Sequence, residues 1–239
     1  MHTLRTLAMA TMASLLFVLS SAAHADPGKA KPADSSDERK KRSLPPEPAV
    51  TYPRGAGKER VEHGEVILGV DEARKKLHAQ HHPHGVLETR RLPGIPQPPA
   101  MTSLEDFAVA KRKLVVINPG PGEYVHVMEG QRNGYKNLTV GITYTAPGGA
   151  PPMHTHPGEE AHVLLEGDIL YALGDELFTI SAPYIVNIPP MVPHSFVNIG
   201  DHLAELVVIF PTNVWEYDVL DYFPFKDLEG AKARAKKVK

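Results

Sequence analysis

The sequence predicts an all-β fold, a sandwich or a barrel, over the second half of the chain. Short runs with the period of strands follow one another, and turns rich in Gly, Pro, Asp and Asn separate them at even spacing. No helical pattern interrupts this series, which argues against alternating strand and helix units. The predicted strands are residues 114–118, 124–128, 138–146, 152–156, 161–165, 169–173, 177–181, 184–188, 194–199 and 203–210.

The composition is that of an ordinary globular protein, with 42% hydrophobic and 23% charged residues. The formal net charge is −2, so we expect neither a nucleic-acid partner nor a membrane-surface partner. The chain has no cysteine, which excludes disulfides, thiolate metal ligands and cysteine nucleophiles.

The first 25 residues have the pattern of a secretory signal peptide. Arg5 gives a positive start, and residues 7–19 form an apolar run that is short for a membrane span. A small-x-small cleavage site ends at Ala25, and cleavage there leaves 25 bases against 28 acids, a net charge of −3. We therefore expect a periplasmic or secreted protein that is free of the membrane after cleavage, with an uncleaved anchor as the alternative.

The expected organisation follows from shifts in composition. The region after the signal holds many prolines and charges and few apolar residues, which predicts a disordered linker. A lead-in with a strand and short helices precedes the barrel, and a short helix or tail with its acids first follows it. The predicted division is signal peptide 1–25, linker 26–60, lead-in 61–112, barrel 113–225 and tail 226–239.

The lead-in carries two helix signals. Residues 65–70 read as a short strand, and Asp71 is a plausible N-cap for a helix that ends near Gln80. Ser103 and Asp106 resemble a capping box for a short helix that ends near Lys111.

Four histidines cluster at the end of the first predicted helix. Pro83 interrupts them, and no acid or cysteine accompanies them. We interpret this cluster as an exposed polar loop, with metal binding as the alternative. The cluster comprises His78, His81, His82 and His84.

The chemistry concentrates between Gly148 and Gly167. His154 and His156 alternate, so on an extended strand both imidazoles point to one face. Glu160 follows after a Pro-Gly turn, and His194 lies in a later strand beyond a proline-rich turn. Imidazole and carboxylate without thiolate suit one divalent transition metal, Fe, Mn, Ni, Co, Cu or Zn, and this donor set leaves coordination positions open.

These residues carry a resemblance to the cupin superfamily. The first cupin motif, G(X)5HXH(X)3E(X)6G, is matched in full from Gly148 to Gly167. The second motif, G(X)5PXG(X)2H(X)3N, is matched in part, because Pro183 and Met191 stand where the family has glycine. We expect the neighbouring prolines to impose a somewhat different turn at Met191.

The resemblance implies a double-stranded β-helix, the cupin jelly-roll barrel, with an N-terminal extension and a short C-terminal helix. It implies that the metal lies inside the barrel, held by His154, His156, Glu160 and His194. Strand alternation then turns further side chains inward. On this basis His162 is the candidate acid–base residue, a packed core histidine being the alternative. Leu164 and Phe196 are the candidate pocket walls, and Tyr171 could reach the same pocket.

Three functions remain open at this point. The first is a metal-dependent oxidoreductase, a dioxygenase acting on a small organic molecule, as the resemblance implies. The second is a protein that holds a metal or small ligand without turning it over, and the third is a metal-dependent isomerase or lyase. The aromatic segment 211–225 would cover an open barrel end or form a homodimer interface.

Overall fold

The computed structural model describes residues 60–62, 64–95 and 100–238. The predicted signal peptide, and the predicted linker up to residue 59, lie outside the described residues. Within the described ranges, no helix combines the length and the apolar character that a membrane crossing requires.

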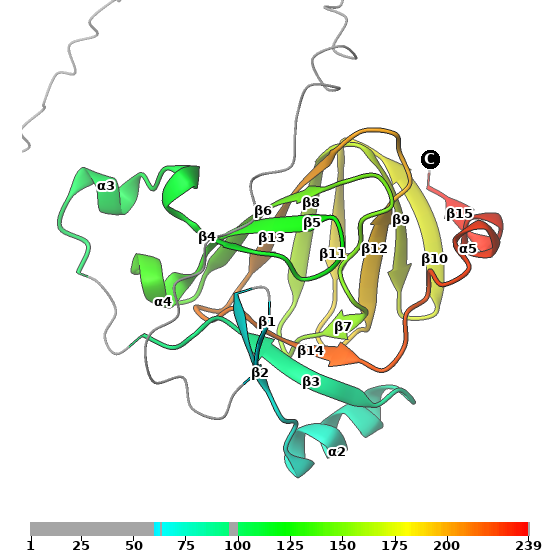
Figure 1. Cartoon of the computed structure of the whole chain (residues 1–239), viewed down its shortest axis with the longest axis horizontal. Helices are drawn as coiled ribbons and strands as arrows, with labels where there is room; N and C mark the ends of the chain where they lie inside the picture. Colours follow the sequence, from blue (N-terminus) through cyan, green and yellow to red (C-terminus); the bar gives the residue numbers. More distant parts are fainter. Residues whose placement is uncertain (1–59, 63, 96–99, 239) are drawn as a thin grey trace, which may run out of the picture. The chain divides into compact units, whose positions relative to one another are not determined.

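The described chain forms two β-sheets (Figure 1). The larger has nine strands in the order β1-β2-β3-β14-β7-β12-β9-β10-β15, and the smaller has six in the order β11-β8-β13-β6-β5-β4. Their strands are β1 Arg60–Glu62, β2 Glu65–Leu68, β3 Val86–Arg91, β4 Val115–Ile117, β5 Glu123–Met128, β6 Thr139–Thr145, β7 His154–Thr155, β8 Glu160–Glu166, β9 Asp168–Leu173, β10 Glu176–Ser181, β11 Tyr184–Ile188, β12 His194–Asn198, β13 Ala204–Phe210, β14 Glu216–Leu220 and β15 Lys236–Lys237.

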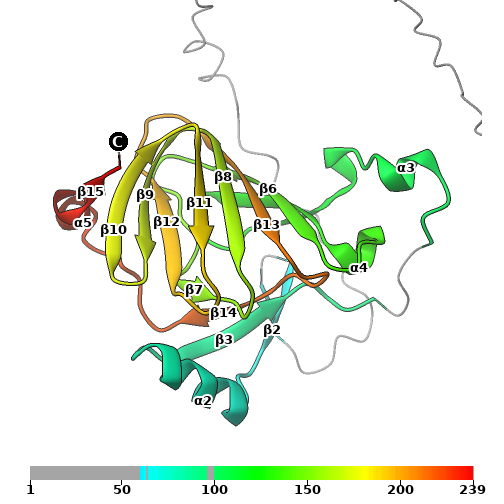
Figure 2. The same cartoon turned by 180° about the vertical axis from the view of Figure 1, so that it is seen from behind.

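Apolar side chains from both sheets meet between them. In β6 and β13, buried and partly exposed residues alternate along the whole strand, as expected where one face of a sheet covers a core. One core cluster joins residues of β5 and β13 to residues of β14, and another joins β8, β11 and β13 to β9, β10 and β12. The fold is therefore the predicted jelly roll, in which the two sheets pack face to face (Figure 2).

The predicted strands between residues 114 and 210 are all present, with ends that move by one or two residues. The turn between β9 and β10 lies at Gly174, where φ is +56°, as the Gly-Asp hairpin signal predicts. Alternating hydrophobicity and turn residues were sufficient to predict these strands because each strand covers the core with one face only.

Of the strands that were not predicted, two longer ones pair with each other. β3 lies antiparallel to β14, and β14 also pairs with β7. Residues 216–220 are thus part of the larger sheet, whereas we expected the aromatic segment to cap the barrel or form an interface. The reason is alternation along this strand, which buries Trp215, Tyr217 and Val219 in the core.

The first predicted helix is confirmed as α2, Glu72–His81, beside β3 (Figure 1). The Asp71 side chain accepts a hydrogen bond from the backbone N–H of Arg74 at 2.7 Å, which satisfies one free donor of the first turn.

The interpretation of the histidine cluster as an exposed loop is wrong for His78. This side chain lies on α2 and is 1% exposed, because it pairs with Asp218 of β14.

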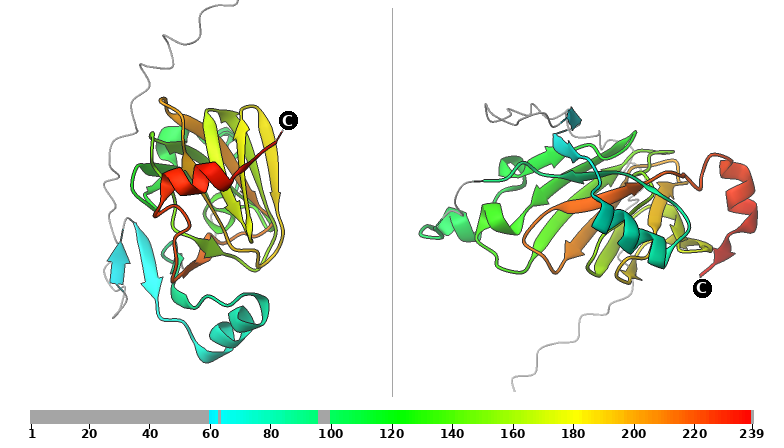
Figure 3. Two further views of the ribbon diagram at one scale, coloured as in Figure 1. Left: turned by 90° about the vertical axis from the view of Figure 1, so that its right-hand side faces the viewer. Right: turned by 90° about the horizontal axis from the view of Figure 1, so that it is seen from below.

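The remaining helices are short. The capping box at Ser103 is confirmed, but α3 spans only Leu104–Phe107, and a 3-10 turn, η1 Lys111–Lys113, follows it. α4, Gly130–Asn133, ends at Gly134 in the left-handed conformation that favours glycine. The predicted C-terminal helix is α5, Leu228–Arg234, and the chain after it pairs along β10 as β15 (Figure 3).

The turn before His194 differs from our expectation. We expected the prolines around Met191 to replace the glycine geometry, but Met191 has a φ of +63°. The left-handed turn is therefore kept with a methionine in it, at a cost of about 1 kcal/mol or more. Its backbone N–H donates to the His156 carbonyl at 3.0 Å, which ties the two histidine segments together.

Candidate metal centre

The first two histidines enter the barrel from β7 and the residue after it. His154 and His156 point to the interior, and their ring centroids lie 6.2 Å apart. Thr155 between them is also buried, but its hydroxyl faces His78 on the other side of the strand at 3.4 Å. The alternation predicted from the HXH pattern therefore holds.

His194 and Glu160 complete the group from neighbouring elements. His194 begins β12, which pairs with β7 so that His194 lies opposite His154, with ring centroids 4.2 Å apart. Glu160 begins β8 in the smaller sheet, so the site spans both sheets. Ligand atoms of His154, Glu160 and His194 lie within 4.8 Å of one another. Glu159 is exposed, as expected of the acid that is not the ligand.

The backbone holds each of the three imidazoles in the same way. Nδ1 donates to a carbonyl two residues away, from His154 to Pro152 at 2.9 Å, from His156 to Gly158 at 2.7 Å and from His194 to Val192 at 2.9 Å. A carbonyl oxygen can only accept, so each Nδ1 carries the proton. Each Nε2 is then left to face the interior, which is the arrangement that metal-binding histidines require.

The Nε2 atoms meet the carboxylate of Glu160. Oε2 of Glu160 lies 2.8 Å from Nε2 of His156 and 3.0 Å from Nε2 of His194. Two nitrogen lone pairs and a carboxylate at these distances need a positive charge between them, either protons or a metal ion. A single divalent cation would satisfy all of these atoms, so the donor set fits a transition metal.

Burial tunes the same groups toward metal binding. It lowers the pKa of His154 well below the ordinary value, with a contribution from His194, and it also lowers the pKa of His194. The neutral imidazole is the form that binds metals. Burial alone would raise the pKa of Glu160, but the electrostatic interaction with His162 and the close contacts of the carboxylate with His156, His162 and His194 outweigh it and hold that pKa well below its usual range.

A fourth imidazole lies behind the carboxylate. Nε2 of His162 is 2.9 Å from Oε1 of Glu160, the oxygen that the other histidines leave free. Nδ1 of His162 is 3.1 Å from the hydroxyl of Tyr171, which is fully buried. His162 thus contacts the carboxylate directly, and Tyr171 fixes its ring from the other side.

A small cavity of about 40 Å³ adjoins these groups, with room for roughly three water molecules. Phe196 lines it, as the sequence predicts, but Leu164 does not. Leu164 faces inward further along β8, where it packs into the core cluster with Ile180 and Leu206. The cavity is lined by Pro119, Glu123, Val125, Thr143, Pro151, His154, Glu160, His162, Phe196, Val208, Phe210, Trp215 and Tyr217.

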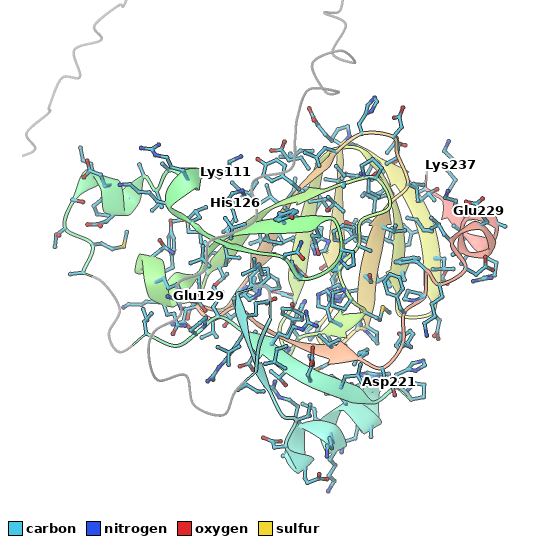
Figure 4. The ribbon with its side chains drawn as sticks, in the orientation of Figure 1. Lys111, His126, Glu129, Asp221, Glu229 and Lys237 are labelled. Carbon is cyan, nitrogen blue, oxygen red and sulfur yellow. The ribbon has the colours of Figure 1, made fainter. Side chains whose placement is uncertain are left out.

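A larger open groove of about 610 Å³ lies next to the cavity. Pro119 and Pro151 line both spaces, so the groove and the cavity adjoin at these two prolines. Asp221 lines the groove near α2 (Figure 4), and its backbone N–H donates to the carbonyl of Gly85 at 3.0 Å.

Sequence reasoning missed two buried acidic groups, one that lines the cavity and one that bonds to residues of its wall. Glu123 begins β5 and lines the cavity. Glu65 is fully buried and accepts hydrogen bonds at 2.9 Å from Trp215 Nε1 and at 2.9 Å from the Tyr217 hydroxyl. Burial raises the pKa of Glu65 to about 7, although the two hydrogen bonds lower it. A glutamate next to a turn is normally predicted to be exposed, so no local sequence pattern indicates that Glu123 and Glu65 are buried.

A jelly-roll barrel with three imidazoles and one carboxylate converging on its interior is a metal-binding β-barrel. Residues 141–210, which hold all four predicted ligands, match the family model described as a cupin domain. Residues 141–210 are therefore a cupin domain, as the two sequence motifs predict.

Comparison with solved structures finds distant similarities. An oxalate decarboxylase from Lactobacillus farciminis is 19% identical, with 45% of this chain and 34% of that chain covered and a TM-score of 0.42. The polyketide cyclase RemF from Streptomyces resistomycificus is 15% identical, with 57% and 100% covered and a TM-score of 0.45. A cupin-like protein from Thermotoga maritima is 21% identical, with 48% and 85% covered and a TM-score of 0.38.

The chain spans about a third of the length of the oxalate decarboxylase. Comparison with curated proteins gives no match. At these sequence identities and TM-scores, the similarities give no information about the substrate.

Proposed function

We propose that the protein is a periplasmic, metal-dependent oxidoreductase of the dioxygenase kind that acts on a small organic substrate. The observation that carries the proposal is the convergence of His156 and His194 Nε2 on Oε2 of Glu160, with His154 in the same group, next to a small cavity. Four protein donors leave coordination positions free, and an open position distinguishes a catalytic metal site from a structural one.

The chain's own residues supply the rest of the site. His154, His156, Glu160 and His194 would hold one divalent transition metal. When bound, that metal would supply a Lewis acid and, if it is redox-active, a path for electrons to O2. The apolar walls keep bulk water out, which strengthens every charge interaction inside the cavity. His162 touches Glu160 and can hold or move a proton there.

A second candidate is a metal-dependent isomerase or lyase that moves protons without redox chemistry. The observation that favours it is the pair formed by His162 and Tyr171, because their hydrogen bond connects a buried hydroxyl to the metal-side carboxylate. Proton transfer by positioned groups is sufficient for such reactions.

The test begins with the full chain produced with its own leader and purified from the periplasmic fraction. Bound metals are measured by mass spectrometry, and O2 uptake is followed against catechols, flavonols, oxalate and thiols. A redox-active metal with O2 uptake supports the oxidoreductase. Product without O2 uptake supports the isomerase or lyase. Stoichiometric metal with neither result means a binding protein and contradicts both.

We also propose that the signal peptide is cleaved on export and that the protein forms a homodimer. If the signal peptide is removed as proposed, the intact mass of the periplasmic protein corresponds to a chain that starts at Asp26. The homodimer is tested by the molar mass from light scattering, and a monomer at all concentrations contradicts it.

A further inference from the structure

Glu123 is a buried acid that the metal centre does not use. It is 3% exposed and points into the barrel on the same face of β5 as Val125 and Val127. It lines the cavity together with His154 and Glu160. The carboxyl group of Glu123 therefore faces the same cavity as His154 and Glu160, from the smaller sheet.

The carboxyl group of Glu123 has no partner of its own. Oε2 is buried without a hydrogen bond to any described residue. The residues that line the cavity include no lysine or arginine, so no fixed cation neutralises it there. An unpaired buried carboxyl group costs several kcal/mol as a charged group and much less as a neutral acid. An apolar residue would fill this position at no such cost, which indicates a use for the acid.

The surroundings favour the protonated form of Glu123. Burial raises its pKa well above the ordinary value, and the nearby Glu65 and Glu160 raise it further. The titratable groups around Glu123 are Glu65 of β2, His154 of β7, Glu160 and His162 of β8, Tyr171 of β9 and Tyr217 of β14.

We propose that Glu123 is the proton donor of this cavity and that its ligand is a small oxygen anion, a carboxylate or an enolate. The neutral carboxyl group hydrogen-bonds to the anion. In the reaction the O–H bond of Glu123 breaks, and its proton forms a bond to the atom of the substrate that carries the negative charge. Glu123 is left as a carboxylate and recovers a proton from solvent. This inference rests on the proposed metal site, which supplies the positive side of the cavity.

The size of the cavity limits the ligand. A space of about 40 Å³ holds an anion of only a few heavy atoms. Any longer substituent must pass Pro119 and Pro151 into the groove. The acidic face of the cavity, formed by Glu123 and Glu160, rejects anions unless the metal and the Glu123 proton are both present.

Infrared spectroscopy of the metal-free full chain tests the neutral acid directly. A protonated carboxyl group has a C=O stretching band that is separate from the carboxylate bands. The background is Glu65→Gln, which removes the other acid with a raised pKa. In a pH titration of that background we expect this band to persist above pH 4.5, the ordinary pKa of a glutamic acid. It should disappear when Glu123→Gln is added and stay when the exposed Glu159→Gln is added. Absence of the band, or its survival in the Glu123→Gln protein, overturns the proposal.

Binding of formate to the zinc-loaded full chain tests the hydrogen bond. We expect Glu123→Leu to weaken formate binding by about tenfold or more, because the donor is lost. Glu123→Gln should retain most of the affinity through its amide N–H, and Glu159→Gln should bind like the unchanged protein. Equal affinity in the Glu123→Leu protein, or no formate binding to the unchanged protein, overturns the proposal.

Zinc content separates this result from a failure of the metal site. Glu123→Leu and Glu123→Gln should bind zinc in the same ratio as the unchanged protein. If the unchanged protein binds no zinc, the proposed function fails, while the infrared result still decides the state of Glu123. If zinc binds but formate affinity does not depend on residue 123, the role of Glu123 fails alone.

Discussion

Nε2 of His162 lies 2.9 Å from Oε1 of Glu160, on the side of the carboxylate that faces away from His156 and His194. The carboxylate is thus held between the predicted ligands and a histidine that no cupin motif includes. His162 belongs to the same strand as Glu160 and points to the same face. Because His162 contacts the carboxylate and would not itself bind the metal, replacing His162 should weaken metal binding less than replacing a predicted ligand does.

Replacing His162 with leucine should weaken metal binding without abolishing it. Loss of a hydrogen bond to a ligating carboxylate lowers metal affinity by about 10- to 100-fold in metal sites generally. Competition with a chelator of known affinity measures the change. His126→Leu is the matched control, since His126 is also buried but lies on the other face of β5, away from the cavity. Equal losses in both variants, or no loss in His162→Leu, contradict the assigned contact.

The buried acid Glu65 should make the stability of the protein depend on pH. Its pKa of about 7 in the folded state lies above the ordinary 4.5, so the folded protein keeps a proton that the unfolded chain loses. Relative to Glu65→Gln, the free energy of unfolding is highest below pH 4.5. It falls as the pH rises to about 7 and is constant above, with a total change of about 3 kcal/mol.

Urea unfolding of the metal-free proteins across this pH range measures the effect. His154 and His194 titrate in both proteins, so their contributions cancel in the difference. A flat difference between the two proteins, or one that rises with pH, contradicts a raised pKa at Glu65.

The ion pairs that hold α2 on the barrel should contribute strongly to stability. Asp218 is buried and bonds to Arg74 at 2.7 Å, to Thr89 at 2.6 Å and to His78 at 2.8 Å. Asp218→Ala leaves these partners without their acceptor, which should lower the free energy of unfolding by about 3 kcal/mol or more. Glu216→Ala is the control. It removes the more exposed partner of the same arginine and should cost less than about 1 kcal/mol. Urea unfolding measures both free energies. A similar decrease in the two variants would contradict a larger contribution from the buried pairs.

The turn at Met191 offers a test of backbone strain. Glycine is normally less stabilising than alanine at an ordinary position. At a φ of +63° the order should reverse, so Met191→Gly should be more stable than Met191→Ala by about 1 kcal/mol. Thermal unfolding of the two variants gives the comparison. Alanine being the more stable of the two would mean that the turn relaxes to negative φ in solution.

The convergence of the four predicted ligands could be foreseen from sequence because three of them lie within seven residues of one another. Over that distance the strand period and one turn determine which side chains share a face. His194 was found because the second motif places it at the start of a strand. The same local reasoning set the inward face of β8, and with it His162.

Other parts of the site depend on pairings between distant segments. Glu65 reaches Trp215 and Tyr217 because β2 and β3 extend the sheet next to β14. His78 is buried because Asp218 lies beneath α2. No local pattern contains such information, and alternation alone could not place Leu164. It faces inward as predicted, but its position along the strand puts it in the core and away from the cavity.

The most direct measurement of the central claim is the metal content of the purified full chain by mass spectrometry. We predict one divalent transition metal per chain, close to full loss in His154→Ala and Glu160→Ala, and no change in Glu159→Gln. Full metal content in His154→Ala and Glu160→Ala would contradict the metal centre described above.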